Sequence, residues 1–290
     1  MRSSRREVKP PRFELSDDEL ERIRAVTSRP IGPLGFARLL LRAPYLIPET
    51  VRVLAGCART ITASSALSSL VHAERAREVV PDAAIGAGWY PEDEFLAALM
   101  PRLGPTLDVL ELGCGSGRLS RHVPERVRSL VCTDLSRAMV EEARRTLARH
   151  ANVEVRVTNG FELREFADRS FDLVFAAGVI GYIDPVQLLG LLDEVRRVLR
   201  DGGELLFSVA LIDEQQVAES LLAAARAAAK HRRPSGIVDR PYCLAQIDGL
   251  LRLSGLELVE PRPGESVTAT WRANVIARRP PKPGLSSPEL

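Results

Sequence analysis

A glycine-rich turn contains the residues best suited to chemistry in this sequence. The apolar run at 107–112 is followed by glycines at alternate positions, Gly113, Gly115 and Gly117. Glycine lets the backbone turn sharply and leaves no Cβ between the main chain and a ligand. A helix starting directly after the turn would point its free N–H groups at the same place. We therefore expect a polar or anionic group of a small ligand to bind there.

Asp134 indicates that this ligand contains a nucleoside. It follows a second apolar run at 128–133. In a parallel α/β sheet, a carboxylate at the end of the second strand reaches the ribose hydroxyls of a nucleoside bound over the first turn. A dinucleotide fingerprint needs its third glycine at position 118, where this chain has Arg118. The spacing therefore disfavours a nicotinamide cofactor.

Four stretches in order resemble the motifs of class I S-adenosylmethionine-dependent methyltransferases. The first is Glu-Leu-Gly-Cys-Gly-Ser-Gly at 111–117, and the others lie at 131–136, 170–175 and 192–207. The resemblance spans roughly residues 85 to 278. It implies S-adenosylmethionine as the cofactor and methyl transfer as the reaction.

The resemblance also implies which residues contact the cofactor. Glu111 would orient the glycine loop or a water bound to it, and Asp134 would accept from the ribose hydroxyls. Leu135 and Met139 would lie against the adenine, unless Met139 is plain helix core. The polar adenine contact stays open between the Asn159 side chain and the backbone near Phe161, because the family commonly has an acidic residue here. The full implied set is Tyr90, Glu111, Gly113, Cys114, Gly115, Gly117, Asp134, Leu135, Met139, Asn159, Gly160, Phe161 and Ala177.

No motif marks the acceptor or a catalytic base. Methyl transfer from a sulfonium is an in-line displacement, so the protein mainly aligns the reactants and excludes water. A hydroxyl acceptor would gain from a general base, for which Tyr182 and Asp184 are preferred over His72 because they follow the fourth expected strand. We expect a small-molecule acceptor, such as a hydroxyl of a secondary metabolite. A non-catalytic cofactor-binding subunit and a nicotinamide-dependent oxidoreductase remain alternatives.

The order of apolar and helical patterns predicts the fold that positions these residues. Strands and helices alternate, which favours a Rossmann-like doubly wound α/β sheet. Two closing strands joined by a connection at 261–264 predict a hairpin, so one of seven strands near the C-terminus is antiparallel. Strands are expected at 107–112, 128–133, 153–157, 171–177, 204–209, 256–259 and 271–277, and helices at 91–103, 137–150, 186–200 and 243–254.

Composition shifts divide the chain into segments. Residues 1–12 form a basic tail expected to be disordered, and 280–290 form a second such tail. Residues 13–80 predict a helical extension that packs on the main domain, covers the substrate as a lid, or presents a surface to a membrane or a partner protein. The cofactor-binding domain is expected at 81–279, with a helical insertion at 212–240 on the ligand side of the sheet.

Charge and cysteine usage exclude several other classes of protein. The chain has 290 residues and a net charge of +2, which gives no general attraction to nucleic acid. The four cysteines lack Cys-x-x-Cys spacing, so a metal site is not expected and reduced thiols in the cytoplasm are favoured. The apolar stretch at 31–71 is broken by proline and charge, which argues against a membrane span. A homodimer stays open.

Overall fold

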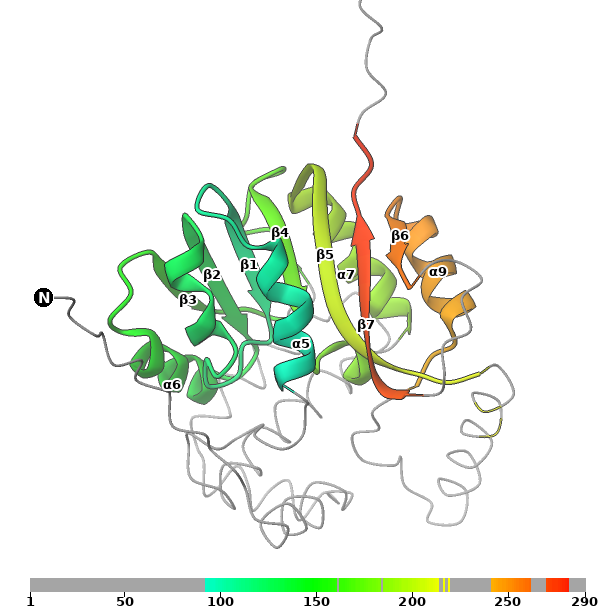
Figure 1. The fold of residues 1–290 in the computed structure, drawn as a ribbon, viewed down its shortest axis with the longest axis horizontal. Coiled ribbons are helices and arrows are strands. Elements are labelled where there is room, and N and C mark those ends of the chain that lie inside the picture. The colour runs from blue at the N-terminus through cyan, green and yellow to red at the C-terminus, as the bar shows by residue number, and fades with distance from the viewer. Residues whose placement is uncertain are drawn as a thin grey trace, which may run out of the picture.

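A seven-stranded sheet forms the centre of the computed structural model (Figure 1). The residues that the structure describes are 92–160, 162–183, 185–213, 216, 219, 241–261 and 270–281. The tail at 1–12, the extension at 13–80, most of the insertion at 212–240 and most of the tail at 280–290 lie outside them. The predictions for those segments therefore stay predictions.

The elements alternate along the chain as the sequence patterns predict. The strands are β1 (Asp108–Leu112), β2 (Ser129–Asp134), β3 (Val153–Val157), β4 (Phe171–Ala176), β5 (Leu199–Leu211), β6 (Glu257–Glu260) and β7 (Thr270–Arg278). The α-helices with described bounds are α5 (Glu92–Leu99), α6 (Arg137–Leu147), α7 (Pro185–Val198) and α9 (Leu244–Leu253).

The strand order β3-β2-β1-β4-β5-β7-β6 confirms the Rossmann-like doubly wound sheet. Strands β1 to β5 pair in parallel, whereas β7 pairs antiparallel with both β5 and β6. In Figure 1 the arrow of β7 points upward between its two neighbours. The expected closing hairpin is therefore present. Because β1 lies between β2 and β4, its carboxyl end lies where the sheet reverses its winding, which is the usual ligand position in such folds.

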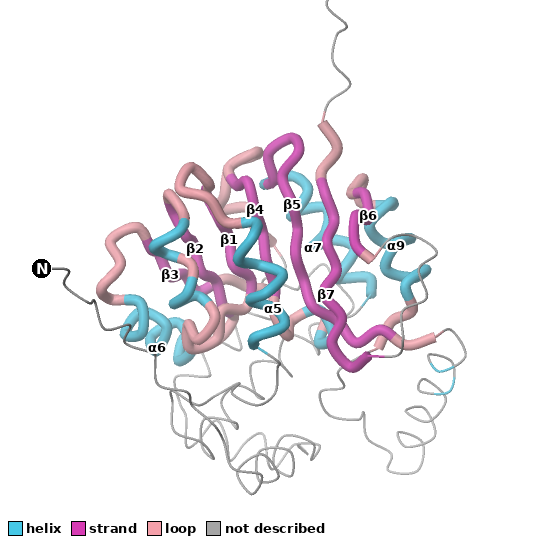
Figure 2. The backbone as a smooth tube through the Cα atoms, in the orientation of Figure 1, coloured by secondary structure: helices cyan, strands magenta, loops and turns pink. Residues whose placement is uncertain are grey.

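Helices lie on both faces of the sheet (Figure 2), and a hydrophobic core fills the space on each face. Consecutive residues of β1 point to opposite faces, with Leu110 in one core and Val109 in the other. Burial on both faces explains why the strands are continuous apolar runs. The helical residues of the first core are Leu188, Leu191, Leu192, Val195 and Val198 from α7 and Ile247 and Leu251 from α9; those of the second are Phe95 and Leu99 from α5 and Val140, Ala143 and Leu147 from α6.

The predicted helix directly after β1 is wrong. Across residues 113–128, all of which the structure describes, the chain forms turns and two short 3₁₀-helices at Ser120–His122 and Pro124–Arg126. A single α-type bond joins Arg121 N to Gly117 O at 3.1 Å. Pro124 has no N–H and its ring clashes with a preceding helical turn, so the helix does not continue.

Other boundaries differ from the prediction for similar reasons. Helix α5 ends at Leu99 and passes into a 3₁₀ turn because Pro101 follows. Strand β5 begins five residues earlier than the predicted 204, at Leu199, and includes Gly202 with a φ of 81°. Its pairing with β4 shifts register at this point, which accommodates the extra residues.

The chain leaves and re-enters the sheet at adjacent points around the insertion. Ile212 N donates to Tyr242 O at 3.0 Å, and Tyr242 N donates to Ala210 O at 2.9 Å. Leu211 and Tyr242 form an isolated parallel bridge. The two ends of the segment between them are therefore joined by main-chain hydrogen bonds.

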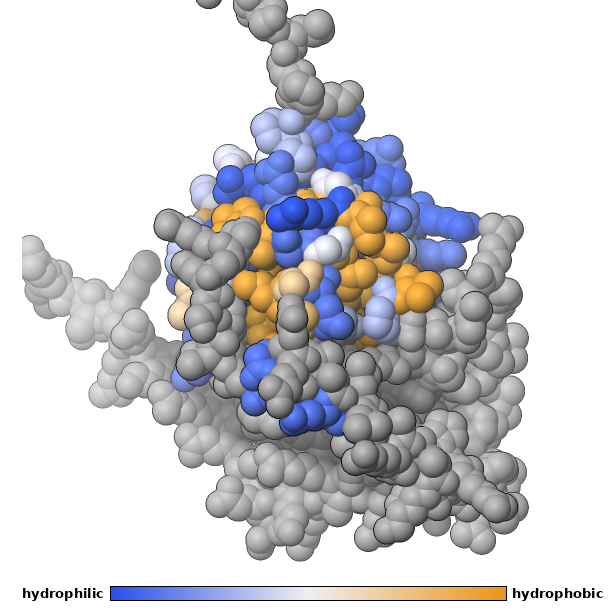
Figure 3. All heavy atoms as spheres, turned by 90° about the vertical axis from the view of Figure 1, so that its right-hand side faces the viewer, coloured by the Kyte–Doolittle hydropathy of each residue, from blue (hydrophilic) through white to orange (hydrophobic). Residues whose placement is uncertain are grey.

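The outer strand β6 is protected by charge. Glu257 and Glu260 at its two ends are both exposed, so antiparallel pairing with a second copy would set like charges opposite each other. Figure 3, which faces this side of the molecule, shows apolar side chains gathered beneath a polar rim. Leu253 of α9 is 75% exposed.

None of the described helices is long and apolar enough to cross a bilayer.

Candidate functional site

Three glycines with positive φ shape the loop at the carboxyl end of β1. Gly113, Gly115 and Gly117 have φ values of 69°, 54° and 81°, which other L-residues rarely adopt. A Cβ at Gly113 would lie 2.4 Å from Val179 Cγ2, and one at Gly117 would lie 3.3 Å from Ala143 Cα. These two glycines therefore allow close packing of the protein itself.

Gly115 differs from its neighbours because it faces open space. Apart from Gly115 itself and its two chain neighbours, no described atom lies within 4 Å of the place where its Cβ would be. Its N–H donates to Asp134 Oδ2 at 2.9 Å. The loop thus exposes bare backbone beside the carboxylate that the sequence predicts to be a ribose acceptor, which fits a nucleoside approaching the main chain.

Asp134 joins the glycine loop to the start of α6. Its Oδ1 accepts from Ser136 N at 2.8 Å, and Ser136 in turn caps α6 by accepting from Met139 N at 3.4 Å. Burial raises the pKa of the Asp134 carboxyl, while the N–H groups of Ser136 and Gly115 oppose that rise. Each carboxylate oxygen has a second lone pair, so Asp134 can still accept from a ligand hydroxyl.

Glu111 lies below the loop and points into the fold. It is 2% exposed and accepts from Ser120 Oγ and, at 3.5 Å, from Cys132 Sγ. Burial raises its pKa to about 7, although both hydrogen bonds lower it. Ser120 begins the 3₁₀ turn that follows the glycine loop. Its hydrogen bond to Glu111 therefore links that side of the loop to β1, which agrees with the role expected for Glu111. Sequence reasoning missed Ser120, which no motif marks.

Cys114 is held within the loop by its backbone. Its N–H donates to Thr133 O at 2.9 Å, its carbonyl oxygen accepts from Gly117 N at 3.0 Å, and its thiol is buried. The hydrogen bond with Cys132 and burial raise the pKa of the Cys114 thiol well above its ordinary value. A buried neutral thiol is chemically inert, so any contact of Cys114 with a ligand would be made by its main chain.

Glu92 ties α5 to the same loop. It forms ion pairs with Arg118 and, at 3.7 Å, with Arg121, and it lies within hydrogen-bond distance of His122 Nε2 at 3.2 Å. Burial opposes ionisation of Glu92, but these three partners together hold its pKa below the ordinary value. Arg118, which breaks the dinucleotide pattern, therefore has a structural partner.

The turn after β3 uses the Asn159 side chain internally. Asn159 Oδ1 accepts from Glu162 N at 2.9 Å, and Nδ2 donates to Glu162 Oε2 at 3.4 Å. Gly160 has a φ of 80° and open space at its Cβ position. Glu162 is an acidic residue in this turn that sequence reasoning missed, although it lies only two positions beyond Gly160.

The other predicted site residues differ in how much they can offer a ligand. Met139 is 4% exposed, so its side chain is mainly core. Leu135, Ala177 and Tyr182 are half-buried, and Tyr182 ends a 3₁₀ turn (Ile180–Tyr182) after β4. The predicted residues that lie outside the described residues are His72, Tyr90, Phe161 and Asp184.

Ser208 of β5 is a further residue at this end of the sheet. It is 1% exposed, and its Oγ accepts from Gly178 N at 2.8 Å, where Gly178 has a φ of 66°. This bond fixes the turn that follows β4.

Among the described residues, no group of three or more His, Cys, Asp or Glu side chains could hold a metal ion.

Comparison with known proteins gives a consistent picture. Residues 109–203 match a family model described as a methyltransferase domain. Malonyl-[acyl-carrier protein] O-methyltransferase of Herminiimonas arsenicoxydans is 38% identical over 117 residues, which are 39% of this chain and 40% of that protein. Demethylmenaquinone methyltransferase of Tropheryma whipplei is 34% identical over 98 residues, 34% of this chain and 39% of that protein. The chain thus matches about two fifths of the length of these relatives.

Solved structures show the same fold. A methyltransferase from Methanosarcina mazei aligns with a TM-score of 0.50 at 18% identity, over 64% of this chain and 98% of that chain. At this identity the similarity concerns the fold alone.

Proposed function

Because the chain carries a domain of the class I S-adenosylmethionine-dependent methyltransferase superfamily, we propose that it binds S-adenosylmethionine at the glycine loop and methylates a small molecule. The observation that carries this proposal is the pairing of Gly115 with Asp134. It sets an open stretch of backbone beside a carboxylate that retains acceptor capacity. The two groups suit a nucleoside whose ribose lies over the loop.

Residues of the glycine loop and of the end of β2 have defined parts in the proposed site. Gly113, Cys114 and Gly115 present backbone to the ribose and methionyl portion. Asp134 accepts from the ribose hydroxyls, and Leu135 supplies an apolar contact for the adenine. The bound cofactor would supply a methyl group on a sulfonium, which needs alignment and exclusion of water rather than a redox or metal centre.

The acceptor in this proposal is a small molecule with a nucleophilic oxygen. The name of the first relative states transfer to oxygen. Tyr182, which follows β4, and the neighbouring Asp184 are the candidates to hold or remove the acceptor proton. Replacing Tyr182 with Phe would lower the turnover of a hydroxyl acceptor and leave cofactor affinity unchanged.

The proposal is tested first by calorimetric titration with S-adenosylmethionine, S-adenosylhomocysteine and NADH. We expect binding of the first two and none of NADH. A panel of hydroxylated small molecules is then incubated with cofactor carrying a labelled methyl group. NADH binding alone would assign the loop to an oxidoreductase, and cofactor binding without methylation of any acceptor would favour a non-catalytic subunit.

A further inference from the structure

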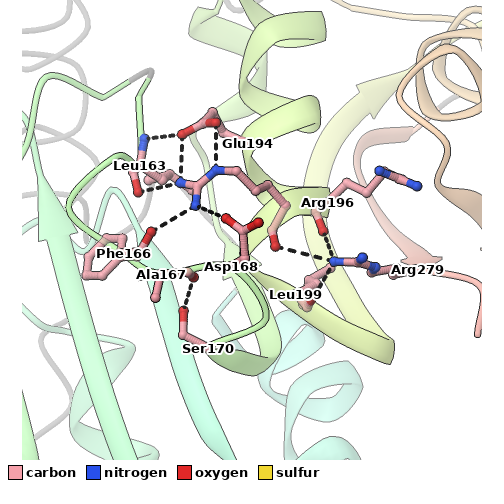
Figure 4. A network of polar contacts seen from close by, with 10 residues as sticks. Leu163, Phe166, Ala167, Asp168, Ser170, Glu194, Arg196, Leu199 and Arg279 are labelled. Atoms are coloured by element: carbon pink, nitrogen blue, oxygen red, sulfur yellow. Dashed lines mark hydrogen bonds and ion pairs between the residues drawn. The ribbon is translucent and has the colours of Figure 1, made fainter.

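An ion pair on α7 holds the loop between β3 and β4 by its main chain (Figure 4). Glu194 Oε2 accepts from Leu163 N at 2.9 Å, and Arg197 Nη2 donates to Leu163 O at 2.8 Å. The two side chains are bonded to each other at 2.9 and 3.0 Å. One ion pair therefore fixes both polar backbone groups of a single loop residue.

Arg197 fixes the next part of the loop as well. Its Nη1 donates to Phe166 O at 2.9 Å and to Asp168 Oδ1 at 2.8 Å. The Arg197 hydrogen bond is the largest cause that keeps the pKa of Glu194 below its ordinary value. Both side chains thus stay charged near neutral pH, and the planar guanidinium spans several acceptors that a lysine could not reach together.

Leu163 directly follows the turn at 159–162, which the family resemblance implies as the polar contact for adenine. Glu162, bonded to Asn159 through its N–H, directly precedes Leu163. At the other end of the turn, Thr158 N donates to Asp134 O at 3.0 Å. The segment 159–162 is therefore anchored on one side to the strand that bears Asp134 and on the other to the Glu194–Arg197 pair.

We propose that Glu194 and Arg197 are positioning residues for the adenine end of the cofactor site, acting through the main chain of Leu163. This inference rests on the proposed function. Short segments fixed at both ends have few conformations, so less ordering entropy is lost when a ligand binds. The pair would therefore favour adenine recognition by keeping the turn in one arrangement before binding.

The loop has an apolar anchor that is independent of the ion pair. Leu163 is 1% exposed and Phe166 is 7% exposed, and both belong to the core that includes α7. Loss of the ion pair should therefore leave the loop attached and the chain folded. The hydrogen bonds of Asn159, Gly160 and Glu162 are the part of the turn that should relax.

Arg279, which directly follows β7, supplies a matched control because it binds the end of the same helix, including Arg197 O at 3.3 Å. It donates to Arg196 O and Leu199 O, both at 2.7 Å, and pairs with Asp201 at 3.0 Å (Figure 4). It is also an arginine that binds backbone carbonyls at the end of α7, but its hydrogen bonds do not reach the loop. Arg279→Met should therefore lower the melting temperature without changing adenine recognition.

The test compares Arg197→Met with Arg279→Met by calorimetry with S-adenosylhomocysteine and with its analogue that carries hypoxanthine in place of adenine. We expect Arg197→Met to weaken S-adenosylhomocysteine binding roughly tenfold and to reduce the preference for adenine over hypoxanthine. Amide hydrogen exchange at Glu162 and Leu163 should become faster in this variant alone. Glu194→Gln keeps an acceptor for Leu163 N, so it should weaken S-adenosylhomocysteine binding less than Arg197→Met does.

The outcomes separate this inference from the function on which it rests. Failure of the wild-type protein to bind S-adenosylhomocysteine would overturn both. Normal wild-type binding with equal adenine preference in wild type and Arg197→Met would overturn the positioning role only. If Arg197→Met does not fold, Arg197→Lys gives the same comparison, because one ammonium group cannot satisfy all the acceptors of a guanidinium.

Discussion

The parallel strands begin at one side of the sheet, the amino edge, and end at the opposite side, the carboxyl edge. The carboxylates at these two edges have different kinds of hydrogen-bond partners. At the amino edge, Asp108 is bonded to Arg128 at 2.8 Å and to Arg200 at 2.8 Å, and Asp172 is also bonded to Arg200. At the carboxyl edge, Glu111 and Asp134 accept hydrogen bonds only from neutral donors within the described part of the chain.

The pKa values follow this difference in partners. The hydrogen bond from Arg128 is the largest cause that holds the pKa of Asp108 far below its ordinary value. Burial raises the pKa of Glu111 to about 7 and also raises that of Asp134. Ionised Asp108 therefore favours the folded state, whereas the ionised carboxylates at the carboxyl edge cost stability and keep acceptor capacity for the loop and a ligand.

Replacing Glu111 with Gln should give the largest effect on this comparison. The folded pKa of about 7 lies above the ordinary 4.5, so the folded state binds the extra proton between these values and wild-type stability falls as pH rises through that window. The variant should lack this loss and gain about 3 kcal/mol relative to wild type between pH 4.5 and pH 8. Urea unfolding at both pH values measures it, and parallel pH profiles would contradict it.

Replacing Asp134 with Ala should weaken cofactor binding by roughly 1–3 kcal/mol, the usual range for losing a buried charged partner. Asp172→Ala is the control at the amino edge, where its bonds to Asp108 N and Arg200 indicate a structural role. It should lower the free energy of unfolding and leave cofactor affinity intact. Equal affinity loss in both variants, measured by calorimetry, would remove Asp134 from the binding site.

Replacing Arg128 with Ala should have the smallest effect. Its side chain is 55% exposed, so solvent screens the ion pair with Asp108 and only a small loss of stability is expected. A carboxyl with a lowered pKa contributes its full stability above the ordinary pKa of 3.8 and loses it only as the pH falls to the much lower folded value, so this loss should shrink progressively below pH 3.8. A loss that persists at low pH would show that the packing of Arg128, rather than its charge, is important.

The central strands were predictable because they are buried apolar runs with clear breaks at their ends, and β3 because its apolar and polar residues alternate. The hairpin of β6 and β7 was also predictable, because two short strand patterns follow one another without a helix between them. The 3₁₀ turns after β1 were not predicted, because the residues around Ser120 are compatible with a helix and the effect of Pro124 was missed. Periodicity cannot show where a short segment changes from α to 3₁₀ geometry.

The candidate site was predictable where its residues lie on strand ends. Gly115 and Asp134 are brought together by the parallel pairing of β1 and β2 alone. The contacts that hold the site were not predictable: Arg197 lies 34 residues from Leu163 in sequence. Such partners depend on the position of α7 over the sheet, which no local pattern specifies.

The hydrogen bonds around Tyr242 have a consequence for how this chain could diversify. Because main-chain bonds join Ile212 and Ala210 to Tyr242, the sheet continues on both sides of the insertion whatever the length of chain between them. Lengthening a connection whose ends are already held together costs little free energy. A lineage could therefore exchange the segment that leaves the sheet at the end of β5 without redesigning the fold or the cofactor loop.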